Sequence, residues 1–301
     1  MKLVALPVSL ILFLSFSGRA QTTITVATYQ YATNTRIDNI KPLAEHLSTA
    51  CACKASVKSY ASVSAMLTGM EDKESDLVLM NTFGYLLLKP QQQDYTPLTT
   101  LQVAKGKQST YQSAIVIRKE LGITSFETLK QNASSLTLRL VNPGSTSGNL
   151  APRLGMASVG IEDADKAFKS ITYSKNHSLT LQEVANGKFD VGAFGSEEYT
   201  KALKLDSTLA DKVTLLWMSS DIPLGPVMIK KSLDKKLSQC IKKELLALHS
   251  KNKAALESVK AGWTEAIPAD KYILVSPKYY QQWLDTMGGV KALPIIQQFA
   301  N

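Results

Sequence analysis

The chain has 301 residues, with 34 Lys and Arg against 25 Asp and Glu and a formal net charge of +9. Hydrophobic residues make up 45% and charged residues 20%, which is ordinary globular usage and excludes a disordered or collagen-like polymer. Three cysteines are too few for a disulfide-built scaffold, and three separated histidines (His46, His177, His249) argue against a multi-histidine metal site. A length near 300 residues favours two domains or lobes.

The first 20 residues have the pattern of a cleaved secretory signal. Met1 and Lys2 precede an apolar run that ends at Phe16, and small residues then lead to Gln21. The alternative is an uncleaved anchor, although the run is short for a membrane span. No cysteine follows the run, so nothing supports lipid attachment, and no later stretch is long and apolar enough to cross a bilayer. We expect an exported, periplasmic protein with a signal peptide over residues 1–20.

The cysteines carry no assigned chemistry. Exported proteins can keep disulfides, and three cysteines allow at most one internal bridge. A bridge between Cys51 and Cys53 would span a single residue and be strained, so whether these two pair stays open. Cys240 lies beside an apolar stripe with helical spacing and is expected to be a buried core residue.

The first part of the mature chain alternates between strands and helices. Its pattern predicts strands over residues 22–27, 55–60 and 76–80, separated by helices over 39–49 and about 63–69. A β-α-β-α-β order is typical of a parallel sheet with crossover helices.

The middle of the chain repeats this alternation, and the last third is expected to be mainly helical. Strands are predicted over 113–118, 136–141, 189–194 and 213–217, with helices over 125–132 and 178–186. We expect an α/β fold of two lobes joined by crossing strands, with residues 21–113 and 218–301 in lobe 1 and residues 114–217 in lobe 2.

A loop with three consecutive hydroxyl residues follows the strand over 136–141. Gly144 and Gly148 flank Ser145, Thr146 and Ser147, so the backbone can bend sharply and expose its amides. Amides at a helix N-terminus lack intrahelical partners, and with added hydroxyl donors they form a receptor for a tetrahedral oxyanion. The alternative is an ordinary helix cap. Pro152 would fall inside a helix beginning at Ser145, so the first turn must end early or kink.

The same sequence argues against several other functions. No Lys follows Gly148, so the loop is not a nucleotide P-loop, and Thr146 replaces the central Ser of a nucleophile elbow. A serine hydrolase using Ser145 or Ser147 with His177 remains an alternative. Lys pairs in the last third alternate with an apolar stripe, as solvated helix faces do, and no nucleic-acid motif accompanies them, so we expect no nucleic-acid partner.

Five segments in order resemble the periplasmic phosphonate/phosphite/phosphate-binding proteins of ABC transporters. The hydroxyl loop and its later proline (residues 142–152) are similar to the family's anion loop. Downstream, residues 176–177 and 183–191 resemble the family's ligand-contacting His, helix and Asp-bearing strand. Residues 217–226 resemble its Trp-x-Ser-x-x-Ile-Pro-x-x-Pro crossing, and Gly262-Trp263 its late Gly-Trp pair.

The resemblance implies a type II periplasmic binding protein, in which each lobe is a mainly parallel sheet flanked by helices and the ligand lies in the cleft between them. It also implies a set of ligand contacts. Ser145, Thr146 and Ser147 would hold the phosphoryl oxygens, and His177 would donate from the same lobe. Tyr60 would close from the opposite lobe, and Tyr111 would lie near the hinge. Glu197 would receive the ligand's substituent, with the adjacent Glu198 as an ambiguity.

One position departs from the family pattern. Aminoalkylphosphonate binders place an Asp before the final Pro of the crossing, where this chain has Gly225. A ligand ammonium would therefore lack one of two anionic partners, which leaves phosphite, phosphate and small alkylphosphonates comparably open. A carboxylate at Glu197 would favour a ligand that carries a proton or an amine and would discriminate against sulfate.

These observations predict a solute-binding receptor that captures a phosphonate, phosphite or phosphate-type oxyanion and delivers it to the permease of an ABC importer. We expect a monomer without catalytic residues, metal or cofactor. A sensory binding module of the same fold is an alternative.

Overall fold

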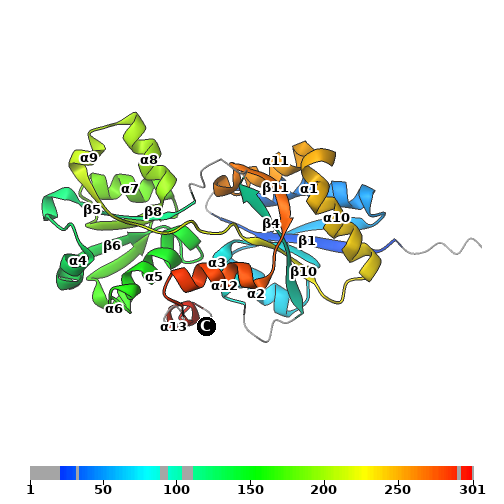
Figure 1. Cartoon of the computed structure of the whole chain (residues 1–301), viewed down its shortest axis with the longest axis horizontal. Coiled ribbons are helices and arrows are strands. Elements are labelled where there is room, and N and C mark those ends of the chain that lie inside the picture. Colours follow the sequence, from blue (N-terminus) through cyan, green and yellow to red (C-terminus); the bar gives the residue numbers. More distant parts are fainter. Residues whose placement is uncertain (1–20, 32–33, 89–93, 104–110, 290–292, 300–301) are drawn as a thin grey trace, which may run out of the picture.

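The computed structural model describes residues 21–31, 34–88, 94–103, 111–289 and 293–299, and the expected signal peptide lies outside them. The described chain forms two α/β bodies side by side (Figure 1). None of the helices in these ranges has the length and hydropathy needed to cross a lipid bilayer.

The first body contains a six-stranded sheet in the order β11-β4-β10-β3-β1-β2. Its strands are β1 (Thr23–Tyr29), β2 (Lys54–Tyr60), β3 (Leu77–Leu79), β4 (Tyr95–Val103), β10 (Pro226–Lys230) and β11 (Ala269–Leu274). Its helices are α1 (Arg36–Ala50), α2 (Val63–Glu71), α3 (Thr82–Leu86), α10 (Lys235–Lys251), α11 (Lys253–Ala261), α12 (Pro277–Thr286) and α13 (Leu293–Gln297), with the short turn η4 (Thr264–Ala266) after α11.

The second body contains a five-stranded sheet in the order β7-β6-β8-β5-β9. Its strands are β5 (Ser113–Arg118), β6 (Thr137–Leu140), β7 (Ser170–Tyr173), β8 (Val191–Gly195) and β9 (Val213–Met218). Its helices are α4 (Phe126–Asn132), α5 (Ala151–Ser158), α6 (Ala164–Ala167), α7 (His177–Ala185), α8 (Ser196–Leu205) and α9 (Leu209–Lys212), with short turns η1 (Lys119–Leu121), η2 (Ala133–Ser135) and η3 (Thr146–Leu150).

Both sheets are mixed, which corrects the expectation of mainly parallel sheets. In the first sheet β1 pairs parallel with β2 and β3, whereas the pairs β10–β3, β10–β4 and β11–β4 are antiparallel. In the second, β6 pairs parallel with β7 and β8, whereas β5 is antiparallel to β8 and β9. Two of the reversed strands follow a crossing between the bodies: β5 enters the second sheet and β10 re-enters the first against the direction of their neighbours. The third, β11, reverses within the first body after α11.

Hydrogen bonds join the two segments that cross between the bodies. The backbone amide of Ile222 donates to the carbonyl of Tyr111 at 2.8 Å, and the amide of Ser219 donates to the carbonyl of Ser113 at 2.9 Å. The Ser219 hydroxyl also accepts from the amide of Ser113. The crossings therefore form one hydrogen-bonded connection, while the exact limits of the lobes (113/114 and 217/218) stay a prediction.

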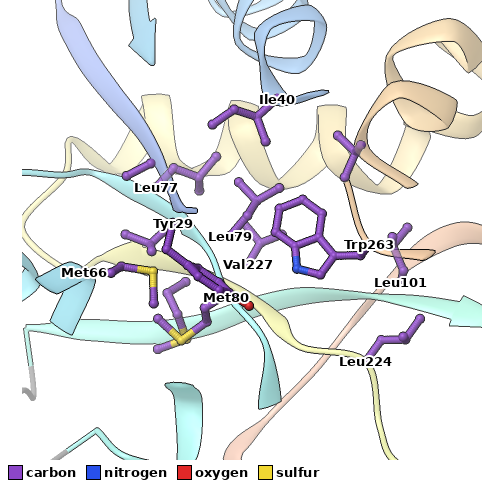
Figure 2. Packing of buried hydrophobic residues seen from close by; sticks show 14 of the residues in the cluster. Tyr29, Ile40, Met66, Leu77, Leu79, Met80, Leu101, Leu224, Val227 and Trp263 are labelled. Carbon is purple, nitrogen blue, oxygen red and sulfur yellow. The ribbon is translucent and has the colours of Figure 1, made fainter. Parts of the chain in front are cut away.

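The main hydrophobic core lies against the first sheet. Figure 2 shows Tyr29 and Trp263 packed among aliphatic and Met side chains from several elements. Met66, Met70 and Met80 are buried, as expected for core residues, and Trp263 is 8% exposed. The same cluster continues to Leu150 and neighbouring residues at the start of α5, so the core also supports the loop that precedes that helix.

A disulfide joins Cys51 and Cys240, which were not predicted to pair. Cys51 caps the C-terminus of α1, and Cys240 lies half-buried in α10, which packs against α1. The expectation that Cys240 is a buried core residue was therefore wrong. The buried free thiol belongs to Cys53, so Cys51 does not pair with its near neighbour. The sequence could not reveal this pairing because the partners are 189 residues apart.

Removing this bridge should destabilise the protein without altering its fold. A crosslink that closes so long a loop contributes about 2–4 kcal/mol through the lost entropy of the unfolded chain. We expect Cys51→Ser with Cys240→Ser to lower Tm by roughly 5–15 °C in calorimetry. Reductant should lower the Tm of the wild type similarly and leave the double variant unchanged. A wild-type Tm that reductant does not move would contradict the assignment.

Candidate functional site

A small cavity lies between the two bodies, with a volume of about 130 Å³. Typical pockets for drug-sized ligands are roughly 300–1,000 Å³, so this one suits a ligand of only a few heavy atoms. Residues from both bodies line it: Tyr29, Tyr31, Asn34, Arg36, Asn81, Gly262, Thr264 and Glu265 on one side, and Tyr111, Ser145, Thr146, Ser147, His177 and Glu197 on the other. Six of the seven predicted site residues are thus brought together.

The hydroxyl loop forms a wide turn that enters the cavity. The Ser145 hydroxyl caps the turn by accepting from the amide of Gly148 at 3.0 Å. The amide of Leu150 reaches back five residues to the carbonyl of Ser145, which makes η3 a π-helical turn. All three hydroxyl residues are buried, at 1–3% exposure.

The π turn resolves the difficulty with Pro152. A regular α-helix beginning at Ser145 would need a hydrogen bond from residue 152 to the carbonyl of Gly148. Pro152 cannot make this bond, because its nitrogen has no hydrogen to donate. That carbonyl instead accepts from the amide of Val141 at 3.0 Å, and α5 begins at Ala151 with Pro152 in its first turn. The π-helical turn therefore ends before the proline, as the proline requires. The backbone amides at the start of this turn remain at the cavity.

Contacts from the first body hold this loop in place. The side-chain amide of Asn81 donates to the carbonyl of Gly144 at 2.8 Å, and the backbone amide of Phe83 donates to Thr146 Oγ1 at 3.1 Å. Thr146 also shares a side-chain hydrogen bond with Tyr111, which lies on a crossing segment. The Thr146 hydroxyl is therefore largely engaged by the protein itself, and the two bodies are closed around the cavity.

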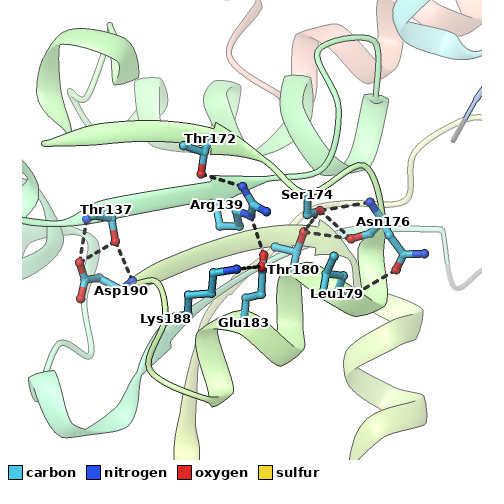
Figure 3. A network of polar contacts seen from close by, with 10 residues as sticks. All are labelled: Thr137, Arg139, Thr172, Ser174, Asn176, Leu179, Thr180, Glu183, Lys188 and Asp190. Atoms are coloured by element: carbon cyan, nitrogen blue, oxygen red, sulfur yellow. Dashed lines mark hydrogen bonds and ion pairs between the residues drawn. The ribbon is translucent and has the colours of Figure 1, made fainter.

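His177 is the first residue of α7. Figure 3 shows the hydrogen bonds and ion pairs that this helix makes with its surroundings. The Asn176 side chain caps it by accepting from the amide of Leu179 at 2.9 Å. Further along, Glu183 of α7 pairs with Arg139 of β6 at 2.6 Å and with Lys188 at 2.6 Å. The cap defines the start of α7, and the pair with Arg139 fastens the helix to β6, so the position of His177 is set by the second lobe.

Hydrogen bonds determine which nitrogen of His177 carries the proton. The backbone amide of Gly195 donates to Nδ1 at 2.8 Å, so Nδ1 is an acceptor and the neutral ring carries its proton on Nε2. Burial keeps this ring neutral, because it lowers the pKa of His177 to about 4. Nε2 lies 2.9 Å from the hydroxyl of Tyr31, to which it donates.

The chain of donors continues from Tyr31 to the hydroxyl loop. Tyr31 donates to the Ser145 hydroxyl at 3.3 Å. Since Ser145 also accepts from Gly148, both of its lone pairs are used, and its own proton is left to donate into the cavity. This order makes Ser145 a donor toward an anion.

The same order conflicts with a serine hydrolase. A general base must accept the proton of the nucleophile, yet both nitrogens of neutral His177 are committed, one as acceptor from Gly195 and the other as donor to Tyr31. Tyr31 lies between His177 and Ser145 in the chain of hydrogen bonds. The site is therefore built to donate to a bound group rather than to activate Ser145.

Glu197 lies in the cavity, and its carboxyl is unusual. Its Oε2 is buried without a hydrogen-bond partner. Burial, reinforced by the charges of Glu265 and Glu198, raises the pKa of Glu197 to about 7. The carboxyl folds back over Gly195, where an added Cβ would lie only 2.7 Å from its oxygens. Glu198 instead pairs with Lys201 at 2.9 Å outside the cavity, so geometry favours Glu197 as the residue facing the ligand.

Tyr60 does not line the cavity. It ends β2, and its hydroxyl bonds to Ser75 at 2.8 Å and to Glu74 at 3.0 Å. The aromatic residues that the first body brings to the cavity are Tyr29 and Tyr31, at and after the end of the adjacent strand β1. The structure thus contradicts the expected role of Tyr60, since its hydroxyl is already used elsewhere.

The charged groups of the first body were not predicted from the sequence. Arg36 begins α1 and Glu265 lies in η4, more than 200 residues apart, so no local motif joins them. Gly225, where the family's aminoalkylphosphonate binders carry Asp, is explained by packing: an added Cβ would lie 1.9 Å from the carbonyl oxygen of Met80. No side chain fits at this position, and it does not line the cavity.

Comparison with known proteins identifies the family of the chain. The model of the family described as "ABC transporter, phosphonate, periplasmic substrate-binding protein" matches residues 24–272, most of the chain. The chain belongs to this family. The match includes both sheets and the elements that carry the cavity, so its fold and its cavity can be compared with those of other phosphonate-binding family members.

Among curated proteins, a probable ABC transporter phosphite-binding protein, PhnD1 of Prochlorococcus marinus, is 24% identical over 159 residues, 52% of each chain. The chain therefore spans about half the length of that relative in the match. A solved binding-protein component of an ABC phosphonate transporter from Pseudomonas aeruginosa is 19% identical, with a TM-score of 0.63 and coverage of 93% of this chain and 95% of the other. PhnD1 solved with methylphosphonate is 20% identical, with a TM-score of 0.65 and coverage of 89% and 97%. These structures confirm the two-lobed periplasmic binding fold.

In this family member the proton on His177 can be tested directly. We expect the imidazole to stay neutral, with the proton on Nε2, down to about pH 5, because protonation would break the bond from Gly195 and charge a buried ring. Nitrogen-15 spectra of the imidazole side chains across about pH 4–8, assigned with His177→Gln, would measure this. A His177 signal that titrates near the ordinary value of about 6.5 would contradict it.

Proposed function

We propose that this protein captures a small phosphoryl oxyanion (a phosphonate, phosphite or phosphate) and delivers it to the permease of an ABC importer. The observation that carries the proposal is the hydroxyl loop facing a closed cavity of about 130 Å³. The loop offers amides at a helix start together with the Ser145 proton, and such groups replace the hydration shell of an anion. The family match and the solved complex of PhnD1 with methylphosphonate support the ligand class.

Glu197 supports a preference for ligands that still carry a proton. A pKa near 7 means that the carboxyl is about half protonated at neutral pH. The protonated carboxyl can donate a hydrogen bond to a ligand oxygen. The ionised carboxylate repels a bare dianion. Sulfate carries no proton in this range, so the carboxyl would disfavour it relative to hydrogen phosphite or a hydrogen phosphonate.

We propose reversible binding without catalysis. The hydrogen bonds of His177 leave it no role as a base for Ser145. Among the described residues no group of three or more His, Cys, Asp or Glu side chains is placed to hold a metal ion. The disulfide between Cys51 and Cys240 fits an oxidising compartment such as the periplasm, which supports export by a cleaved signal peptide.

Ligand class and site can be tested together by calorimetric titration with phosphite, phosphate, methylphosphonate and sulfate. We expect binding of at least one phosphoryl ligand and much weaker binding of sulfate. Ser145→Ala should weaken that binding by about 10–100-fold, because it removes a donor to an enclosed anion, worth about 1.5–3 kcal/mol.

Ser125→Ala is the matched control for that variant. Ser125 caps α4 as Ser145 caps η3, but it lies on the surface away from the cavity. It should cost similar cap stability and leave affinity unchanged. Equal losses of affinity in the two variants, or no binding of any phosphoryl ligand, would refute the proposal.

Affinity should fall as pH rises. If the ligand needs protonated Glu197, a pKa near 7 predicts an additional loss of about tenfold between pH 6 and pH 8, beyond the effect of the ligand's own ionisation. Glu197→Gln keeps the shape and cannot ionise, so the ratio of wild-type to variant affinity should fall across this range. Glu198→Gln is the control and should largely retain the wild-type profile. A ratio independent of pH would exclude Glu197 as the titrating group.

A further inference from the structure

The first body contributes two buried polar side chains, Tyr29 and Arg36, to the cavity wall. Tyr29 Oη and Arg36 Nη1 have no partner at ordinary hydrogen-bond geometry, and the contacts that Tyr29 makes with Arg36 and Trp263 fall outside that geometry. Their side chains are 1% and 4% exposed, so water outside the protein does not satisfy them. Buried donors are nearly always paired in folded proteins, and exceptions call for a ligand or an ordered water. The cavity is the place where such a partner would lie.

The guanidinium of Arg36 is held rigidly at this wall. Its Nε donates to the carbonyl of Gly262 at 2.8 Å. Its plane lies against three aromatic rings, with Cζ 4.6 Å from the Tyr29 centroid, 4.8 Å from Tyr31 and 4.6 Å from Trp263. These contacts fix the guanidinium at the cavity wall beside the Tyr29 hydroxyl. An arginine so oriented presents a permanent positive charge, because guanidinium does not lose its proton in proteins.

Two carboxyls, those of Glu197 and Glu265, also line the cavity. Burial raises the pKa of Glu265, although the charge of Arg36 acts in the opposite direction. Burial raises the pKa of Glu197 to about 7. Tyr31 has a raised pKa and His177 a lowered one, so both are neutral near pH 7. Arg36 is the one Lys or Arg side chain among the described residues that line the cavity.

We infer that Arg36 completes the oxyanion site from the first lobe and makes it select phosphoryl ligands whose substituent is absent or neutral over those with a cationic substituent. The inference rests on the proposed function and narrows its ligand class to phosphite, phosphate and small alkylphosphonates. The hydroxyl loop binds the anion from the second lobe, while Arg36 Nη1 and Tyr29 Oη donate from the first.

The small cavity brings a bound ligand close to Arg36. The ligand would share a volume of about 130 Å³ with this side chain, which lines the wall. At such short range like charges repel strongly in a site that excludes water. Gly225 adds to this, because the backbone of Met80 and Asn81 occupies the space in which an acidic side chain would have to lie. The aminoalkylphosphonate zwitterion thus meets a cation and lacks one of its usual anionic partners.

The test compares two probes in the same protein by calorimetric titration at neutral pH: methylphosphonate, and 2-aminoethylphosphonate, which adds an ammonium. We expect the wild type to bind methylphosphonate at least tenfold more tightly. Arg36→Met removes the charge while keeping an apolar side chain against the rings, so it should weaken methylphosphonate binding and reduce the ratio at least threefold. Arg36→Lys keeps the charge and should keep the preference, at lower affinity for both probes.

The ratio separates selection from a purely structural role. A variant that is only destabilised loses affinity for both probes equally, so its ratio stays at the wild-type value, and this outcome would overturn the inference. A wild type that binds 2-aminoethylphosphonate as tightly as methylphosphonate would also overturn it, even if Arg36→Met failed to fold. Both results leave the proposed function standing, whereas a wild type that binds no phosphoryl probe refutes that function itself.

Discussion

A directed chain of hydrogen bonds across the two lobes is the constraint on which the site depends. It begins at the backbone amide of Gly195, which fixes the tautomer of His177, and passes through Tyr31 to Ser145. Each group donates to the next, so the direction set by one backbone amide leaves the last hydroxyl proton facing the cavity. Because Tyr31 comes from the first lobe and the other members from the second, the chain is complete only when the lobes are closed. Closure of the lobes therefore completes the set of donors that faces the cavity.

Burial controls the protonation of the site as much as it controls packing. The hydroxyl loop follows β6, Glu197 follows β8 and Tyr31 follows β1, so these groups come from the carboxyl ends of strands, where binding sites of α/β sheets form. Closing these ends against each other removes water, which lowers the pKa of His177 and raises that of Glu197. Both shifts favour the uncharged forms of these two groups in a wall that also contains the cation of Arg36. Charge-assisted hydrogen bonds to an enclosed anion are strong in such surroundings.

Local patterns were enough to predict the elements that carry the second lobe's half of the site. The strand before the hydroxyl loop, the helix that starts at His177 and the strand before Glu197 were all expected within a few residues of β6, α7 and β8. The four-residue strand β7 was missed. The strands β4, β10 and β11 were also missed, because β4 contains Pro97 and the others are short runs in a part of the chain whose helices dominate the pattern. These strands pair antiparallel with partners far away in sequence, and the two cysteines that bridge α1 and α10 are equally remote from each other. Such long-range pairings leave no local signal.

The residues that the first lobe contributes to the site were harder still to predict from local sequence patterns. Tyr29 and Tyr60 lie opposite each other at the ends of paired strands, and nothing in the two short sequences tells which end reaches the other lobe. The sheet order decides it, because β2 lies at the edge and β1 lies inside, next to β3. An inner position also brings the start of α1 under η4, which places Arg36 beside Gly262 and near Glu265. Ligand selectivity then depends on a contact between residues far apart in the chain, so relatives with the same hydroxyl loop can differ in ligand if they differ at Arg36. Motif resemblance therefore indicates the class of anion, whereas Arg36 of the opposite lobe adds a restriction on what may be attached to it that no motif reveals.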